Sequence, residues 1–146
     1  MLNEPKKKLS IILFSGDFDK IHYGLVTASA AAAINIPVTL FFTMAATRSL
    51  VKGPKNQWWE ISGGKTFGSQ KTAREINQLY EEQKVANFEE LLNACVSMKV
   101  KFMICEMGLR ALNIERSDLR NNIPIKIGGV VSFLEDNCFQ SQIIFI

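Results

Sequence analysis

The sequence predicts one α/β domain in which helices cover a mostly parallel sheet. Two observations support this fold class: short apolar runs alternate with helical patterns along the chain, and the final run is again strand-like. The length of 146 residues suits a single domain, and neither an internal repeat nor a linker divides it. We therefore expect residues 1–146 to fold as one domain.

The first part of the chain predicts a strand, a helix and a second strand, in that order. The strands are "KLSIILFSGD" and "IPVTLFFT", which have the unbroken apolar runs of strands buried on both faces. The helix between them is "DKIHYGLVTASAAAAIN", and Asp17 or Asp19 can cap its first turn.

The segment from Met44 to about Gln83 has a weaker pattern, and we expect an irregular excursion there. Four glycines fall between Gly53 and Gln70, a high density for this length. Structureless loops this long are usually functional or disordered. We expect Gly53 to Gln70 to be the most mobile part of an isolated subunit.

Regular patterns return after this excursion and continue to the end of the chain. Apolar residues recur there at the spacing of a surface helix, at Phe88, Leu91, Leu92 and Cys95. The elements that follow are the strand "KFMIC", the short helix "EMGLRALNI", the strand or extended lead-in "IPIKIGG", the helix "VVSFLEDNC" and the strand "QIIFI". We expect the last strand to be buried in the sheet, because it is so apolar.

Charge and hydropathy argue against two classes of protein. The net charge of +3 is too small to indicate a nucleic-acid partner. No charged residue lies between Lys20 and Arg48, a length that could cross a bilayer, but Asn35 and Pro37 interrupt it, so we expect no membrane span. The apolar run near the N-terminus is too short for a signal peptide. We expect a cytosolic protein whose three cysteines are reduced.

Two other motifs do not fit the chemistry that they suggest. The stretch "SGGKT" lacks the glycine that a phosphate-binding loop needs five positions before Gly64, where Trp59 stands. His22 is the only histidine, which excludes a histidine-based metal cluster and gives little support to a hydrolase dyad with a cysteine. We therefore expect neither a metal nor an organic cofactor.

The position of Cys105 distinguishes it from the other two cysteines. It ends a predicted strand, and α/β sheets bind ligands beyond the carboxyl ends of their strands. We expect Cys95 and Cys138 late in helices, at the edge of the sheet opposite Cys105, as small core residues. The strand that separates Cys95 from Cys105 is about 15 Å long, which is too far for a disulfide between them. A cysteine that opens a helix faces free N–H groups that favour the thiolate. The alternative is a packing cysteine at a strand end.

Several other residues are candidates for the same site. Asp17, Asp19 and Lys20 follow the first strand at the same edge; they are either helix caps and solvated charges or site residues, and Lys20 could hold an anionic substrate. Arg110 can offset the charge of Glu106 beside the thiol. Trp58 and Trp59, near three lysines, suggest either a lid over the Cys105 face or a subunit interface.

Three segments of the chain resemble the DsrE/DsrF-like family. They are "SGDFDKIHYGLVTASAAAAINIPVTLFFT", the cysteine segment "VKFMICEMGLRALNI" and the Gly-Gly-Val stretch "IGGVVSFLED". The branch that the chain resembles is described as peroxiredoxin-like or as sulfurtransferase, and its cysteine segment commonly reads Cys-x-Met-Ser-Met-Asp. Cys105 and Met107 match this pattern, whereas Gly108, Leu109 and Arg110 depart from it.

This resemblance implies a three-layer α/β/α fold that assembles as trimers or hexamers. It also implies that Cys105 carries a persulfide between partner proteins. Two functions follow from the sequence as a whole: a cytosolic sulfur carrier or sulfurtransferase that acts through Cys105, or a non-catalytic oligomeric binding module in which this cysteine is structural. The sulfur donor and acceptor are not identified by the sequence.

Overall fold

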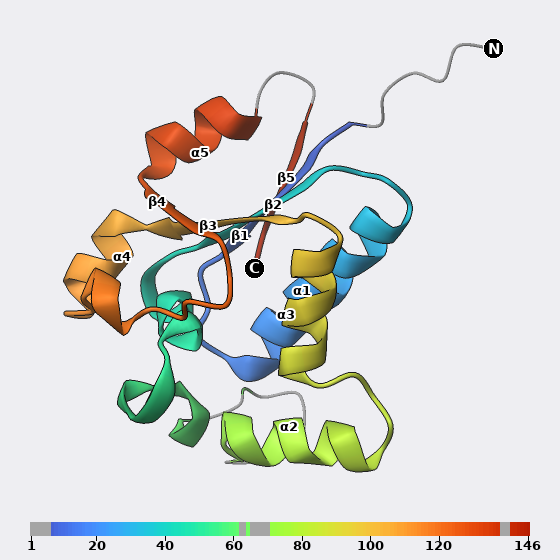
Figure 1. Cartoon of the computed structure of the whole chain (residues 1–146), viewed down its shortest axis with the longest axis vertical. Coiled ribbons are helices and arrows are strands. Elements are labelled where there is room, and N and C mark those ends of the chain that lie inside the picture. Colours follow the sequence, from blue (N-terminus) through green and yellow to red (C-terminus); the bar gives the residue numbers. More distant parts are fainter. Residues whose placement is uncertain (1–6, 62–63, 65–70, 138–140) are drawn as a thin grey trace.

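Five parallel strands form the centre of the computed structural model, in the order β4-β3-β2-β1-β5 (Figure 1). The structure describes residues 7–61, 64, 71–137 and 141–146. The strands are β1 (Leu9–Leu13), β2 (Val38–Phe42), β3 (Lys101–Cys105), β4 (Ile125–Gly128) and β5 (Gln142–Phe145). The predicted parallel sheet is therefore confirmed, and "IPIKIGG" forms a strand.

The helices lie on both sides of this sheet and complete the three layers (Figure 1). On one side, α1 (Phe18–Ala33) packs against α3 (Phe88–Ser97), and α2 (Ala73–Glu82) lies beyond the start of α1. On the other side stands α5 (Val130–Asn137). The short helix α4 (Glu106–Ala111) begins where β3 ends. The three-layer α/β/α architecture is thereby confirmed.

The apolar core consists of two unequal parts, one on each face of the sheet. The larger cluster joins the sheet to α1, α2 and α3, and it includes Trp58 and Cys95. The smaller cluster lies between the sheet and α5 and consists of Phe41, Met103, Cys105 and Phe133. Side chains of a strand alternate between its two faces, so neighbouring residues of β3 belong to different clusters. Cys105 is therefore on the face that α5 covers.

The segment from Met44 to Gln83 is more regular than the sequence predicted. Its described residues form three 3-10 helices, η1 (Met44–Leu50), η2 (Gly53–Lys55) and η3 (Trp58–Glu60), and then α2. A capping box begins α2: Thr72 accepts a hydrogen bond from the Glu75 amide, and the Glu75 side chain accepts one from the Thr72 amide. The expectation of a mobile segment at Gly53 to Gln70 falls partly on residues 62–63 and 65–70, which lie outside the described residues.

The last strand is tied into the sheet, but it is not buried as the sequence predicted. It pairs in parallel with β1 at the edge of the sheet. Ile143, Ile144 and Phe145 are 44%, 36% and 65% exposed. The reason is its outer position, where the helices of the described chain leave it uncovered. Apolar composition alone did not distinguish a central strand from this edge strand.

No helix among the described residues combines the length and the apolar character that crossing a bilayer requires. The uncharged stretch from residue 21 to 47 is divided between α1, a turn and β2. In that turn Asn35 adopts the left-handed conformation (φ 64°), which ends the helix. The chain then enters β2, whose five residues are all buried.

Candidate functional site around Cys105

Cys105 is the last residue of β3 and stands immediately before α4. Its backbone pairs with Gly128 of β4, at the carboxyl edge of the sheet. The sequence predicted this position at the junction of a strand and a helix, and the structure confirms it. Cys105 has the extended backbone of a helix cap, but its side chain makes no capping hydrogen bond to α4. The expected contact between the sulfur and free N–H groups is therefore missing in this conformation.

The thiol of Cys105 is buried, with 1% of the residue exposed. It packs in the small cluster with Phe41 and Met103 of the sheet and Phe133 of α5. The rings of Phe41 and Phe133 are stacked, with centroids 4.7 Å apart. A thiol that must react needs a route to solvent, whereas this one is covered by a helix. The sequence placed Cys105 at the correct edge but gave no sign of this cover.

Cys95 is a core residue, as the sequence predicted. It is fully buried on the opposite face of the sheet, and its sulfur lies 3.8 Å from the carbonyl oxygen of Leu25. Burial raises the pKa of the Cys95 thiol to about 11, which suppresses its reactivity. Cys95 and Cys105 are both free thiols, with the sheet between them. The predicted core position of Cys138 lies outside the described residues.

Asp17, Asp19 and Lys20 lie at the start of α1, at the same edge of the sheet as Cys105. However, α1 packs on the opposite face from α5, and β2 separates β1 from β3. That separation is about 10 Å at the usual spacing of strands. Asp17 occupies the N-cap position without a side-chain capping bond. Lys20 is exposed, and its amide donates to the Asp19 carboxylate at 2.9 Å. The fold therefore does not bring Lys20 beside the thiol.

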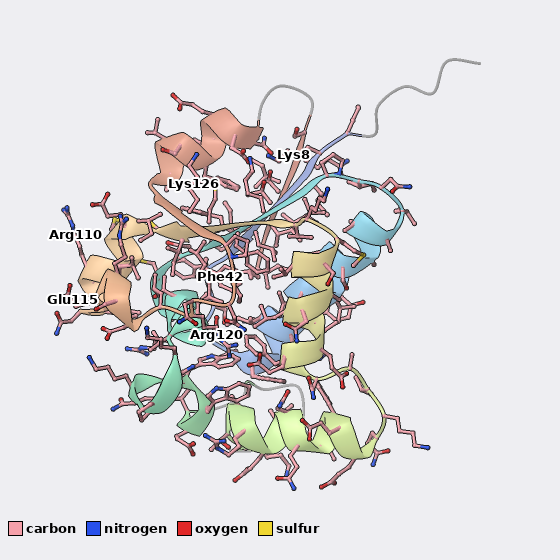
Figure 2. All side chains as sticks on the ribbon, viewed as in Figure 1. Lys8, Phe42, Arg110, Glu115, Arg120 and Lys126 are labelled. Atoms are coloured by element: carbon pink, nitrogen blue, oxygen red, sulfur yellow. The ribbon has the colours of Figure 1, made fainter. Side chains whose placement is uncertain are left out.

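Met107 and Arg110 lie on the outer side of α4. Met107 is 59% exposed, and Figure 2 shows Arg110 at the rim of the molecule. The Arg110 guanidinium donates to the Glu106 carboxylate at 3.1 Å, one helical turn away, so these two charges neutralise each other in solvent. Arg110 thus offsets Glu106, as the sequence suggested. These residues form an exposed surface that adjoins the buried thiol.

The structure explains why Gly108 stands where the family branch that the chain resembles commonly has serine. A Cβ atom built at Gly108 would lie 2.7 Å from the Met44 amide nitrogen and 2.9 Å from the Thr47 methyl carbon. The close approach of α4 to η1 therefore requires a residue without a side chain. A serine at this position would displace one of the two helices. The glycine is a packing requirement of this chain.

Trp58 needs a correction, because it is neither a lid nor an interface residue of this subunit. It is fully buried, packs against Phe18 and Phe88, and its indole N–H donates to the Gly16 carbonyl at 2.7 Å. Trp59 is half-buried beside it and lies under the Arg74 guanidinium, 5.9 Å from the ring centroid. The first tryptophan thus belongs to the core that α1, α3 and η3 share.

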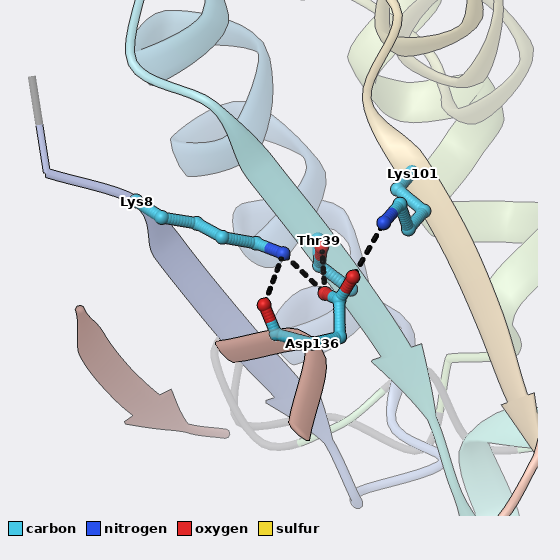
Figure 3. A network of polar contacts seen from close by, with 4 residues as sticks. All are labelled: Lys8, Thr39, Lys101 and Asp136. Atoms are coloured by element: carbon cyan, nitrogen blue, oxygen red, sulfur yellow. Dashed lines mark hydrogen bonds and ion pairs between the residues drawn. The ribbon is translucent and has the colours of Figure 1, made fainter. Parts of the chain in front are cut away.

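Sequence reasoning missed a polar cluster at the opposite edge of the sheet (Figure 3). Asp136, in the last turn of α5, accepts a hydrogen bond from Thr39 at 2.8 Å and forms ion pairs with Lys8 and Lys101. Lys8 also donates to the Asp136 carbonyl at 2.9 Å. The order of elements could have predicted this cluster. Parallel strands align their amino ends at one edge of the sheet, and a helix that follows a strand returns the chain, here with Asp136, to that same edge.

Two cavities near α4 do not include the thiol in their lining. One of about 490 Å³ is lined by Arg48, Asn56 and Asp118, and one of about 340 Å³ by Glu106 and Arg110. In the part of the chain that the structure describes, no group of three His, Cys, Asp or Glu side chains is arranged to hold a metal ion.

The fold and the site together place this protein in a class: α/β proteins with a parallel sheet and a cysteine at its carboxyl edge. The model of the DsrE/DsrF/DrsH-like family matches residues 5–145, and the chain belongs to this family. It is 26% identical to the sulfur carrier protein DsrE2 of Allochromatium vinosum, over 89% of this chain and 92% of that protein. It is also 26% identical to the uncharacterized protein YrkE of Bacillus subtilis, over 92% of this chain and 94% of that protein.

Two solved structures share the fold of this chain. The YchN protein of E. coli aligns with a TM-score of 0.59 at 15% identity, over 96% of this chain and 99% of that one. Protein MTH1491 of Methanobacterium thermoautotrophicum, described as of unknown function, aligns with a TM-score of 0.62 at 10% identity, over 97% and 100%. Both likenesses support the three-layer architecture.

Proposed function

We propose that this protein is a cytosolic sulfur carrier or sulfurtransferase that holds sulfur as a persulfide on Cys105. One observation carries the proposal: the thiol stands at the carboxyl end of a central strand in a chain of the DsrE/DsrF/DrsH-like family. Ligands of α/β sheets bind at this edge. A relative aligned over 92% of its length is named a sulfur carrier protein, which supports the same chemistry.

The proposed reaction has two balanced halves. The Cys105 thiolate attacks the outer sulfur of a donor persulfide, the S–S bond of the donor breaks, and the donor leaves as a thiolate. An acceptor thiolate then attacks the outer sulfur on Cys105 and releases the Cys105 thiolate. Both halves are thiol–disulfide-type exchanges without net oxidation, so the reaction requires no cofactor. A reducing cytosol keeps Cys105 available as a thiol.

The partners in this proposal are sulfur donor and acceptor proteins. Met107 and Arg110 form part of the surface that such a partner meets, since both are exposed on the helix that follows Cys105. A homo-oligomer, trimer or hexamer, belongs to the same proposal. The exposed apolar residues of β5, including Ile143 at 44% and Phe145 at 65%, suit subunit contacts better than buried Trp58.

Intact-mass measurement after incubation with a low-molecular-weight persulfide tests the function. We expect the folded chain to gain one sulfur atom, which a reductant removes. Cys105→Ser should abolish this gain, whereas Cys95→Ser and Cys138→Ser should retain it. An unchanged sulfur gain in Cys105→Ser would show that another thiol is responsible and would refute the assignment.

A second candidate function is an oligomeric binding module in which Cys105 is structural. The burial of its thiol among Phe41, Met103 and Phe133 favours this alternative. It predicts that Cys105→Ser lowers stability, that the wild-type thiol takes up no sulfur, and that oligomerisation is unaffected. The mass measurement above separates the two functions.

A further inference from the structure

Helix α5 is the part of the described chain that covers Cys105. Its inner side contributes the fully buried Phe133 to the cluster around the thiol, while Val131 and Leu134 on its outer side are 70% and 52% exposed. Figure 1 shows α5 alone on its side of the sheet, apart from the packed helices of the opposite side. The contacts that hold this helix in place therefore decide how the thiol is covered.

The C-terminal end of α5 is held by the carboxylate of Asp136. This carboxylate contacts the amino ends of three neighbouring strands through Lys8, Thr39 and Lys101 (Figure 3). The Asp136 side chain is 13% exposed, and that of Lys8 is 16% exposed, so water does little to weaken this pair. One side chain therefore anchors the helix to most of the sheet.

The N-terminal end of α5 follows β4 through Gly128 and Gly129. A Cβ atom at Gly129 would meet no atom within 4 Å, whereas one at Gly128 would lie 3.3 Å from the Ser132 Cβ of α5. Gly128 lies opposite Cys105 in the strand register, which places the thiol beside the N-terminal end of the helix. Release of the Asp136 carboxylate therefore removes the ion pairs that join α5 to Lys8 and Lys101, whereas the stacking of Phe133 on Phe41 remains.

We propose that Asp136 is a positioning residue that holds α5 closed over Cys105, so that release of its ion pairs uncovers this thiol and not Cys95. The proposal rests on the proposed function for the role of Cys105, and it adds how access to that thiol is controlled. It does not require any sulfur transfer to be observed, because closure itself can be measured by alkylation.

The test compares alkylation rates of Cys105 and Cys95 by iodoacetamide in the folded full-length chain, with peptide mass analysis to separate the sites. Each weakening of the closed state by about 1.4 kcal/mol raises the open population tenfold. At urea concentrations too low to unfold the chain, we expect Asp136→Asn to speed the labelling of Cys105 by about tenfold or more, and to leave Cys105 faster than Cys95, which labels only through global unfolding. Glu135→Gln removes a neighbouring exposed carboxylate of α5 and should alter neither rate.

Cys95 makes the result specific, because it is buried on the other face of the sheet and reports on general unfolding. A Cys105 rate in Asp136→Asn that equals the Cys95 rate and rises with urea in parallel with it, or no acceleration at Cys105, would overturn the proposal. Lys101→Gln removes one ion pair of the half-exposed lysine and keeps the question decidable if Asp136→Asn does not fold. It should accelerate Cys105 by a smaller factor and leave the Cys105 rate above the Cys95 rate. If Cys105 shows this labelling pattern but takes up no sulfur from a persulfide, the sulfur-carrier function is refuted and the role of Asp136 still holds.

Discussion

Replacement of Asp136 by asparagine also has a calculable effect on the stability of the whole chain. Burial raises the pKa of this carboxyl, but hydrogen bonds from Lys101, Lys8 and Thr39 outweigh burial and lower the pKa from 3.8 to about 2. One pKa unit corresponds to about 1.4 kcal/mol, so the ionised carboxylate contributes about 2.5 kcal/mol to folding. This contribution is complete above the unfolded pKa of 3.8 and is lost as the pH falls through about 2.

Urea unfolding followed by tryptophan fluorescence measures this contribution. At pH 7 we expect Asp136→Asn to lower the free energy of unfolding by about 2.5 kcal/mol, and the difference from wild type to shrink as the pH approaches 2. Glu135→Gln, on the same helix, should stay within about 0.5 kcal/mol of wild type. A loss below about 1 kcal/mol at pH 7, or a difference independent of pH, would refute the pairing argument.

Two further predictions concern other parts of the molecule. Burial lowers the pKa of His22 below 6.5, although the hydrogen bond to the Ala86 carbonyl opposes this shift. The free energy of unfolding should therefore fall as the pH drops below 6.5. Urea unfolding of His22→Gln should lack this pH dependence, and an unchanged pH profile would contradict the prediction. Light scattering of the wild-type chain at micromolar concentration should report a trimer or hexamer, which Ile143→Ser and Phe145→Ser should weaken; a wild-type monomer would exclude the proposed assembly.

The order of strands and helices could be predicted because each has a local signature. The apolar runs of β1, β2 and β3 and the stripe from Phe88 to Cys95 are readable over a few residues. The helix at Ala73–Glu82 was missed even though Thr72 and Glu75 have the spacing of a capping box. The glycines that precede it drew the interpretation toward an irregular loop. That error came from a local signal that was available and not used.

The environment of the site could not be predicted from local patterns. Burial of Cys105 depends on which face of the sheet α5 packs against, and a strand run such as "KFMIC" does not specify that face. Asp136 and Lys8 are 128 positions apart, and their contact follows only once the parallel register is known. Trp58 likewise looked like a surface aromatic until α1 and α3 placed it in the core. Long-range packing decided all three cases.

Because β5 lies at the edge of the sheet, the stability of this protein can depend on the protein concentration. No other strand of the described chain pairs with the outer edge of β5, so its backbone N–H and C=O groups there are open to another polypeptide. An uncovered apolar edge is also where partly folded chains join incorrectly. Association that covers this edge adds its free energy to the stability of each subunit by mass action. If the chain assembles as proposed, the strand that completes the sheet makes the newly synthesised, still unassembled chain the form most exposed to misassembly.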